Sequence, residues 1–399
     1  MNAPSNALSG LPTARPEEVG LSSAGLRRMT DAMEREIAAR HAPGMSMLIA
    51  RHGKVAFAQS LGALRPDGPP MSADAIFRIY SMTKPIVTVA AMTLVEEGRL
   101  LISDPLAKYI PAFADMKVGV ENGDKLDLVP AKRPITIQDL MRHTSGLTYG
   151  FTGLGAVQKL THAAGIMSHD RSTAEHMEVL ATLPLQHQPG EVWEYSLSTD
   201  VLGRVIEIVA GRSLGEFLRE RIFAPLGMTD TGFYTPESKH ARRALPFSFD
   251  LLNSAGADTT ELSAPPRCEM GGGGLFSTIS DYARFLAMVS GGGAFNGGRI
   301  LGSRTLAFMA SDHLGPHVVK NHPLLWPGHG FGLGFAVRLD AGIAPTAGAV
   351  GEYFWGGIAG TVFWISPRDA LFAILMVQAP EYREYFRLLF RNLVNAAIV

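Results

Sequence analysis

Residues 81–98 read SMTKPIVTVAAMTLVEEG, a Ser-x-x-Lys motif that runs directly into a long apolar stretch. The stretch is apolar nearly all round a helix, which predicts a helix over residues 81–97 that is buried between two layers of the fold. Gly98 is a typical C-terminal cap for such a helix. Pro85 fits the first turn, because N–H groups there have no partners within the helix. The motif therefore opens a central, buried helix.

The spacing of Ser81 and Lys84 has a chemical meaning. Residues three apart lie on one face of a helix, so the lysine amine can sit beside the serine oxygen and act as a base. The first turn also offers free N–H groups and the positive end of the helix dipole, which favour developing negative charge. The alternative is coincidence, since two common residues at a fixed spacing arise about once in a chain of this length.

Two other segments could complete a site around Ser81. Tyr195 follows a Pro-Gly turn and precedes a predicted helix, so its phenol lies on a connecting segment and can pass protons. WGGI at residues 355–358 ends a predicted strand, and its paired glycines let the backbone approach a ligand closely. An N–H there could form an oxyanion hole with the N–H of Ser81. Taken singly, these segments are better explained as a structural tyrosine and an ordinary turn.

In this order and spacing, the three segments resemble the family VIII carboxylesterases, which are esterases on the fold of class C β-lactamases and penicillin-binding proteins. The resemblance runs from about residue 22 to the C-terminus. It implies that Ser81 is the nucleophile of an acyl-enzyme, and that Lys84 and Tyr195 move protons, without deciding which is the initial base. It implies no cofactor and no metal, and an oxyanion hole made by the backbone N–H groups of Ser81 and Ile358. The supporting stretches are LMRHTSGL at 140–147, PLGM at 225–228 and GLFST at 274–278.

Two departures from the β-lactamase pattern suggest the substrate. Trp355-Gly356-Gly357 stands where those enzymes carry Lys-Thr-Gly, and Leu197 stands where they carry the Asn of Tyr-x-Asn. The changes remove a cation and an amide that contact β-lactam and D-Ala-D-Ala substrates. We therefore expect Trp355, Gly356, Gly357 and Leu197 to line a pocket for small esters with short acyl chains.

Predicted strands cluster at the two ends of the chain, with helices between them. This pattern predicts an α/β (α+β) fold of the β-lactamase/transpeptidase type, with an antiparallel sheet flanked by terminal helices over 22–40 and 381–397. Residues 1–80 and 270–399 would form the sheet domain and residues 81–269 a mostly helical domain, with the site at their interface. The strands are expected over 45–50, 55–61, 331–339, 349–355, 361–366 and 371–378, and a small excursion hairpin at 122–123. Internal helices are expected over 136–143, 200–210 and 280–289.

Bulk composition limits the partners. A formal net charge of -1 and a sequence pI near 6.9 give no electrostatic attraction to nucleic acid or anionic membranes. No apolar run approaches the roughly 20 residues that span a bilayer, and residues 1–18 lack the pattern of a secretory signal. With one cysteine, Cys268, no disulfide can form within the chain. We expect a cytoplasmic protein that acts on a small-molecule ester; its oligomeric state is left open.

Other candidate motifs have structural explanations. GRSLG at 211–215 fits the Gly-x-Ser-x-Gly nucleophile elbow, but a helix precedes it and Ser213 forms a capping box with Glu216. His143 is expected to brace a helix end near the site. Three histidines spaced by seven residues predict a polar helix face rather than a metal site: His162, His169 and His176.

Two alternatives remain open. On the same scaffold, the chain could be a β-lactamase, a D,D-peptidase or an acyltransferase. In a different class, it could be a catalytically silent scaffold that binds a ligand or a partner protein.

Overall fold

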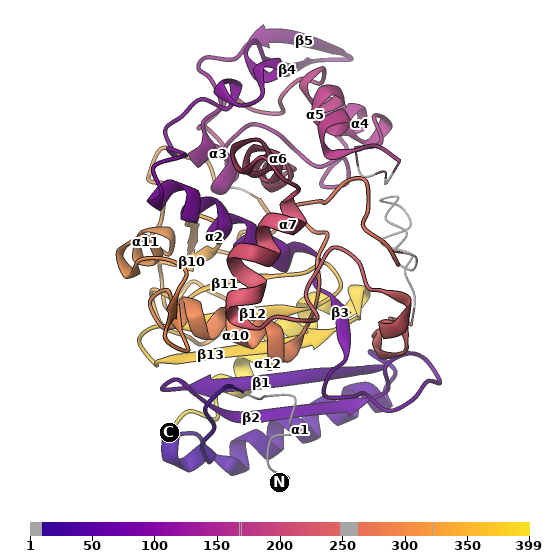
Figure 1. The fold of residues 1–399 in the computed structure, drawn as a ribbon, viewed down its shortest axis with the longest axis vertical. Coiled ribbons are helices and arrows are strands. Elements are labelled where there is room, and N and C mark those ends of the chain that lie inside the picture. The colour runs from indigo at the N-terminus through magenta and orange to yellow at the C-terminus, as the bar shows by residue number, and fades with distance from the viewer. Residues whose placement is uncertain (1–9, 167, 169, 248–261, 321) are drawn as a thin grey trace.

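A seven-stranded antiparallel sheet forms the base of the molecule (Figure 1). The structure, a computed structural model, describes residues 10–166, 168, 170–247, 262–320 and 322–399. The strand order is β2-β1-β13-β12-β11-β10-β9. The strands are β1 Gly44–Arg51, β2 Lys54–Gly62, β9 His329–Phe331, β10 Ala336–Arg338, β11 Tyr353–Gly356, β12 Val362–Ser366 and β13 Leu371–Val377.

The sheet is built from the two ends of the chain, as predicted. β1 pairs with β13 from Met45↔Val377 to Arg51↔Leu371. Both strands are almost continuously apolar, which is typical of strands covered on both faces, and every residue of β13 is buried. α1 Ser23–Ala38 and α12 Arg383–Asn395 pack on each other and on the sheet, and α10 Ile279–Ser290 packs on β1 and β13. The fold is therefore of the predicted class.

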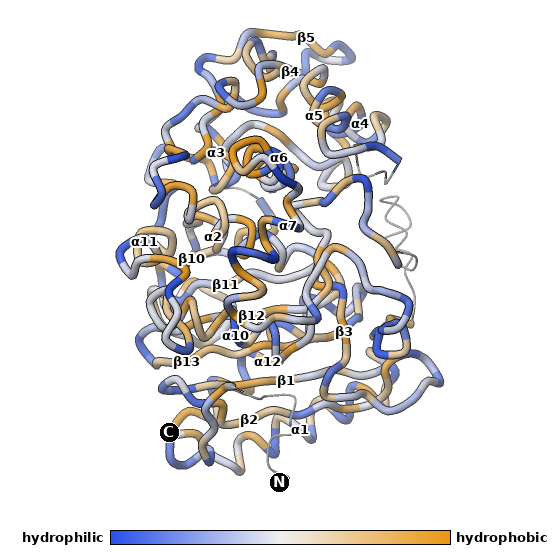
Figure 2. Tube along the Cα trace, viewed as in Figure 1, coloured by the Kyte–Doolittle hydropathy of each residue, from blue (hydrophilic) through white to orange (hydrophobic). Residues whose placement is uncertain are grey.

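The helical part lies on the side of the sheet away from β2 and α1, and a β-hairpin marks its far end (Figure 1). α2 Thr83–Glu96 packs on α6 Ser198–Ala210, and hydrophobic residues run along both helices (Figure 2). The hairpin is formed by β4 Lys117–Asn122 and β5 Lys125–Pro130, where an excursion was predicted. The remaining helices are α3 Ile137–Met141, α4 Ala156–Ala163, α5 Thr173–Ala181, α7 Leu214–Leu218, α8 Ala224–Leu226 and α11 Ser303–Met309.

Short elements connect these parts. β3 Ile76–Arg78 pairs with β6 Phe276–Thr278 where the chain passes between the sheet and the helices, and β7 Ala294–Phe295 pairs with β8 Gly298–Arg299. The division into residues 1–80 with 270–399 and residues 81–269 stays a prediction. Short helical turns are η2 Pro16–Val19, η3 Tyr80–Met82, η4 Leu106–Lys108, η5 Pro111–Phe113, η6 Arg219–Phe223, η7 Glu237–Arg242 and η8 Pro380–Tyr382.

Some element predictions were wrong in their bounds. The strand expected over 349–355 is β11, which begins only at Tyr353 because residues 350–351 form a turn. The strand expected over 331–339 is a hairpin of β9 and β10, because the chain reverses at residues 332–335 and the Gly332 N–H donates to the Phe335 carbonyl. Gly334, with a φ of 86°, supplies the left-handed conformation of that turn. The helix expected from residue 81 begins as α2 only at Thr83, after the 3-10 turn η3. None of the helices in the described ranges has the length and apolar character needed to cross a bilayer.

Candidate active site

Ser81 lies in the 3-10 turn η3, immediately before the buried helix α2. The preceding Tyr80 has a φ of 44°, a conformation that costs a non-glycine residue about 1–3 kcal/mol unless its surroundings enforce it. Those surroundings include two long-range contacts: the Tyr282 hydroxyl donates to the Met82 carbonyl over 3.0 Å, and the Ile79 N–H donates to the Leu275 carbonyl. These two hydrogen bonds thus stabilise the turn, in which Ser81 is half-buried.

The structure brings Ser81, Lys84 and Tyr195 together. The Tyr195 hydroxyl donates to Ser81 Oγ over 2.6 Å, and Lys84 Nζ donates to the same oxygen over 3.3 Å. Tyr195 comes from the connecting segment before α6, as predicted. Ser81 and Lys84 do not share one α-helix, but side chains three apart are aligned in a 3-10 turn as well. Two proton carriers therefore meet at one hydroxyl.

Lys84 is 1% exposed, and its amine nitrogen has three hydrogen-bond partners. Besides Ser81, these are the Tyr149 hydroxyl at 3.0 Å and the Gly272 carbonyl at 2.6 Å. The amine is therefore held by fixed partners on every side. A buried polar group needs such partners, because an unpaired one would be destabilising.

Tyr149 and Asp200 were missed in the sequence. The Tyr149 hydroxyl donates to Asp200 Oδ2 over 3.5 Å, and the Gly272 N–H donates to Asp200 Oδ1 over 2.8 Å. Burial raises the pKa of Asp200, opposed by the positive charge of Lys84 and the hydrogen bond from Gly272. Burial, and then the Asp200 charge, raise the pKa of Tyr149 well above its ordinary value. The sequence signal was weak: Asp200 is an acid in the first turn of an apolar helix, and nothing distinguishes Tyr149.

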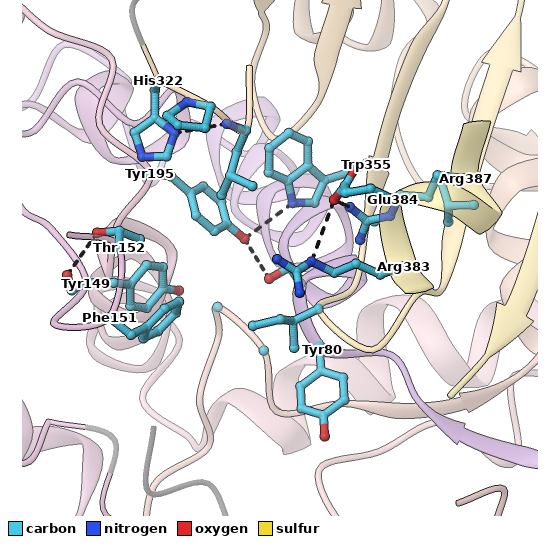
Figure 3. Close-up of a pocket in the computed structure, with 18 of the residues that line it drawn as sticks. Tyr80, Tyr149, Phe151, Thr152, Tyr195, His322, Trp355, Arg383, Glu384 and Arg387 are labelled. Atoms are coloured by element: carbon cyan, nitrogen blue, oxygen red, sulfur yellow. Dashed lines mark hydrogen bonds and ion pairs between the residues drawn. The ribbon is translucent and has the colours of Figure 1, made fainter. Parts of the chain in front are cut away.

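Aromatic rings hold Tyr195 in place. Trp355 Nε1 donates to the Tyr195 hydroxyl over 3.4 Å, and the two ring centres are 5.3 Å apart (Figure 3). The ring of His143 lies 4.9 Å from that of Tyr195 and hydrogen-bonds to Ser196 over 3.3 Å. Burial lowers the pKa of His143 well below its ordinary value, so the ring is neutral at pH 7. His143 thus braces the segment that carries Tyr195.

The WGGI segment approaches Ser81 along the edge of β11. A side chain at Gly357 would meet the Ile79 carbonyl, since a Cβ there would lie 2.4 Å from that oxygen. The Gly357 carbonyl accepts a hydrogen bond from Arg387, and its N–H donates to Thr361 over 2.8 Å. Within the described part of the chain, no hydrogen bond engages the N–H of Ser81 or of Ile358. Both remain available to an oxyanion.

A cavity of about 480 Å³ opens in front of Ser81 (Figure 3). Trp355, Gly356 and Ile358 line it together with Ser81 and Tyr195, whereas Lys84 and Gly357 lie behind its surface. The expectation that Leu197 lines it was wrong. Leu197 is 1% exposed, and its side chain packs in the core beside a second, very small cavity. It directly precedes α6.

A sequence model of the beta-lactamase family matches residues 29–398. The chain belongs to the beta-lactamase family. Esterase EstB of Burkholderia gladioli is 30% identical over 90% of this chain and 92% of its own length. An uncharacterized protein of Mycobacterium tuberculosis is 36% identical over 78% of this chain and 79% of its own. The solved structure of EstCE1, "a hydrolase with promiscuous acyltransferase activity", is 26% identical and covers 93% of this chain and 98% of its own, with a TM-score of 0.77. The resemblance to family VIII esterases is thus confirmed.

Other polar groups of this beta-lactamase family member have structural roles. Ser213 accepts a hydrogen bond from the Glu216 N–H over 3.2 Å and caps α7, as predicted. Burial raises the pKa of Cys268 to about 12, so it is an unreactive thiol. The predicted histidine face was wrong, because His162 is exposed on α4 while His176 is buried on α5; His169 lies outside the described residues. No cluster of metal-binding side chains occurs in the part of the chain that the structure describes.

Proposed function

We propose that the protein is a serine carboxylesterase that hydrolyses small esters with short acyl chains through an acyl-enzyme on Ser81. One observation carries the proposal: Ser81 Oγ accepts hydrogen bonds from both Tyr195 and Lys84 at the wall of a cavity. A hydroxyl so placed can lose its proton as it attacks a carbonyl carbon. The esterase relatives support the same chemistry.

The geometry supports the following reaction. Ser81 Oγ attacks the ester carbonyl, and its proton passes to the Tyr195–Lys84 pair, which we treat as one unit and which accepts the proton in the form that has already lost one of its own. The N–H groups of Ser81 and Ile358 stabilise the oxyanion of the tetrahedral intermediate. When the intermediate collapses, the alcohol leaves with the proton that the pair returns through Tyr195. Water then attacks the acyl-enzyme by the same route, releasing the acid and restoring Ser81.

The cavity supports a small-molecule substrate. Its volume of about 480 Å³ lies in the usual range for sites that take small ligands. Trp355, which presents an indole where β-lactamases carry Lys-Thr-Gly, favours an apolar ester group over a β-lactam. The cytoplasmic location stays a prediction.

Three alternatives make different predictions. Acyl transfer, which the EstCE1 description mentions for that protein, would yield a new ester when an alcohol is added. A β-lactamase or D,D-peptidase would hydrolyse a chromogenic cephalosporin or a D-Ala-D-Ala peptide as well as an aryl ester. A silent scaffold would not react with a fluorophosphonate.

Two serine variants test the proposal. Ser81→Ala should abolish hydrolysis of 4-nitrophenyl butyrate and labelling by a fluorophosphonate, because the nucleophile is gone. Ser213→Ala is the matched control; it removes a helix cap and should retain both. Hydrolysis by Ser81→Ala at the wild-type rate, or its loss only in Ser213→Ala, would refute the assignment.

A further inference from the structure

The first turns of α12 form one wall of the cavity and carry charge. Arg383, Glu384 and Arg387 all line it, and in Figure 3 their side chains reach from one side toward Trp355 and Tyr195. The reaction outlined above uses none of these groups. In a pocket whose remaining lining is largely apolar, a few charged side chains usually orient a ligand and set its specificity.

The charges on this wall do not cancel. Arg387 is a structural cation: it donates to Glu384 Oε1 over 2.6 Å and to the Gly357 carbonyl, so it both neutralises Glu384 and holds the WGGI segment. Arg383 forms a longer ion pair with the same Glu384 oxygen, at 3.6 Å, and its Nη1 donates to the Pro380 carbonyl. With one acid and two arginines, the wall keeps one positive charge.

Stabilisation of the helix does not explain Arg383. It is the first residue of α12, where the positive end of the helix dipole disfavours a cation. Its side chain is 28% exposed, so it is neither fully solvated nor fixed in the core. A guanidinium in this position has donors to spare for a ligand.

The opposite wall has a different chemistry. Tyr149 and Phe151 lie across the cavity from α12 (Figure 3), with their rings stacked 4.8 Å apart. Asp200, the other acid in the lining, is already bonded to Gly272 and Tyr149 beside Lys84. Arg78 adds further positive charge and lies over the Tyr80 ring at 4.9 Å. The stacked rings of Tyr149 and Phe151 therefore face a wall that carries net positive charge.

We propose that Arg383 binds a carboxylate carried by the substrate, so that the preferred substrates are esters with an acidic group on either the acyl or the alcohol part. A guanidinium suits this task because it can bind a carboxylate through two parallel N–H donors. The inference rests on the proposed esterase function and narrows its substrate class.

Matched pairs of esters test the inference. On the acyl side, mono-4-nitrophenyl glutarate is compared with neutral 4-nitrophenyl pentanoate. On the alcohol side, 4-acetoxybenzoate is compared with 4-acetoxybenzamide. We expect the wild type to favour the charged member of at least one pair, and Arg383→Gln to lower that charged-to-neutral ratio of kcat/KM about tenfold, mainly through KM. Arg383→Lys should lie between, because it keeps the charge without the two-point geometry.

The control is Arg368→Gln, which removes the same charge from an exposed turn outside the cavity and should leave the ratio unchanged. An unchanged ratio in Arg383→Gln for both pairs, or an equal fall in Arg368→Gln, overturns the inference alone if hydrolysis still depends on Ser81. If the wild type hydrolyses none of the four esters, or Ser81→Ala hydrolyses them equally well, the esterase function itself fails and the inference falls with it. Circular dichroism of each variant identifies a folding defect.

Discussion

The Tyr195 hydroxyl lies between Ser81 Oγ at 2.6 Å and Trp355 Nε1 at 3.4 Å. Tyr195→Phe keeps the ring that packs on Trp355 and removes only the group that carries the proton. We expect kcat for 4-nitrophenyl butyrate to fall by about 10²–10⁴-fold, with an unchanged circular dichroism spectrum. A variant that retained full activity would show that Tyr195 has no part in proton transfer.

Tyr149 acts one contact away from the reaction, as a positioning residue for Lys84. Tyr149→Phe removes the acceptor at 3.0 Å from Nζ, so the amine can turn away from Ser81. We expect kcat to fall about tenfold, the effect of one charge-assisted hydrogen bond, with little change in KM. Tyr234→Phe, at an exposed site, is the control. A change confined to KM would assign Tyr149 to substrate binding instead.

At this scale the sequence identified the residues with a recognisable pattern and missed the others. Ser81, Lys84 and Tyr195 were predicted and do meet. Tyr149 could not be predicted, because its contact with Lys84 is made only when segments 65 residues apart fold together. Leu197 was predicted to line the pocket because it stands where β-lactamases carry the Asn of Tyr-x-Asn. The direction of a side chain just before a helix depends on tertiary packing, which a sequence motif does not specify.

At the scale of the elements, α3 depends on one buried acid. Asp139 closes the capping box with Thr136 and accepts hydrogen bonds from Arg133 and Thr144. Burial alone would raise the pKa of Asp139, but the hydrogen bonds from Arg133, the Thr136 N–H and Thr144 outweigh it and lower the pKa from 3.8 to about 2. A carboxyl whose pKa is lower in the folded than in the unfolded chain stabilises the fold at every pH above its pKa in the unfolded chain.

This stabilisation should be lost as the pH falls from about 4 to 2, and the shift corresponds to about 2 kcal/mol. Asp139→Asn should therefore lower the unfolding midpoint at pH 7 and show a weaker dependence on pH between 4 and 2. Thermal unfolding followed by circular dichroism measures both, with the exposed Asp115→Asn as control. An Asp139→Asn profile parallel to that of the wild type would contradict the proposed ion pairing.

Helix α2 shows what a local pattern can and cannot predict. Its apolar run predicted a buried helix, and 12 of its residues are buried. Its start was predicted two residues early, because η3 is held by Tyr282 and Leu275, which are about 200 residues away in the sequence. Ser81 lies in the same turn, so its position depends on these long-range contacts, which the Ser-x-x-Lys motif does not indicate.

At the scale of the whole molecule, β1 and β13 join opposite ends of the chain in the middle of one sheet. Short apolar runs near both termini were enough to predict this sheet. The pairing order was not predictable, and neither was the hairpin of β9 and β10, since an apolar run with glycines fits one strand or two. α12 then packs on this sheet and brings Arg383 and Arg387 to the cavity.

The sheet supports one wall of the cavity. We therefore expect a substitution in its core to lower the stability of the fold more than it lowers kcat. Leu375 is fully buried and pairs with Met47 on one side and Val362 on the other. Leu375→Ala leaves a cavity in the core against one face of the sheet and should cost about 2–5 kcal/mol, whereas Leu339→Ala, at a position 41% exposed, should cost less than about 0.5 kcal/mol. Thermal unfolding measures the difference, and kcat well below the midpoint should stay near the wild-type value in both variants, because Ser81, Lys84 and Tyr195 are anchored in other elements. Equal losses of stability would mean that the join between β1 and β13 is not the core that its burial indicates.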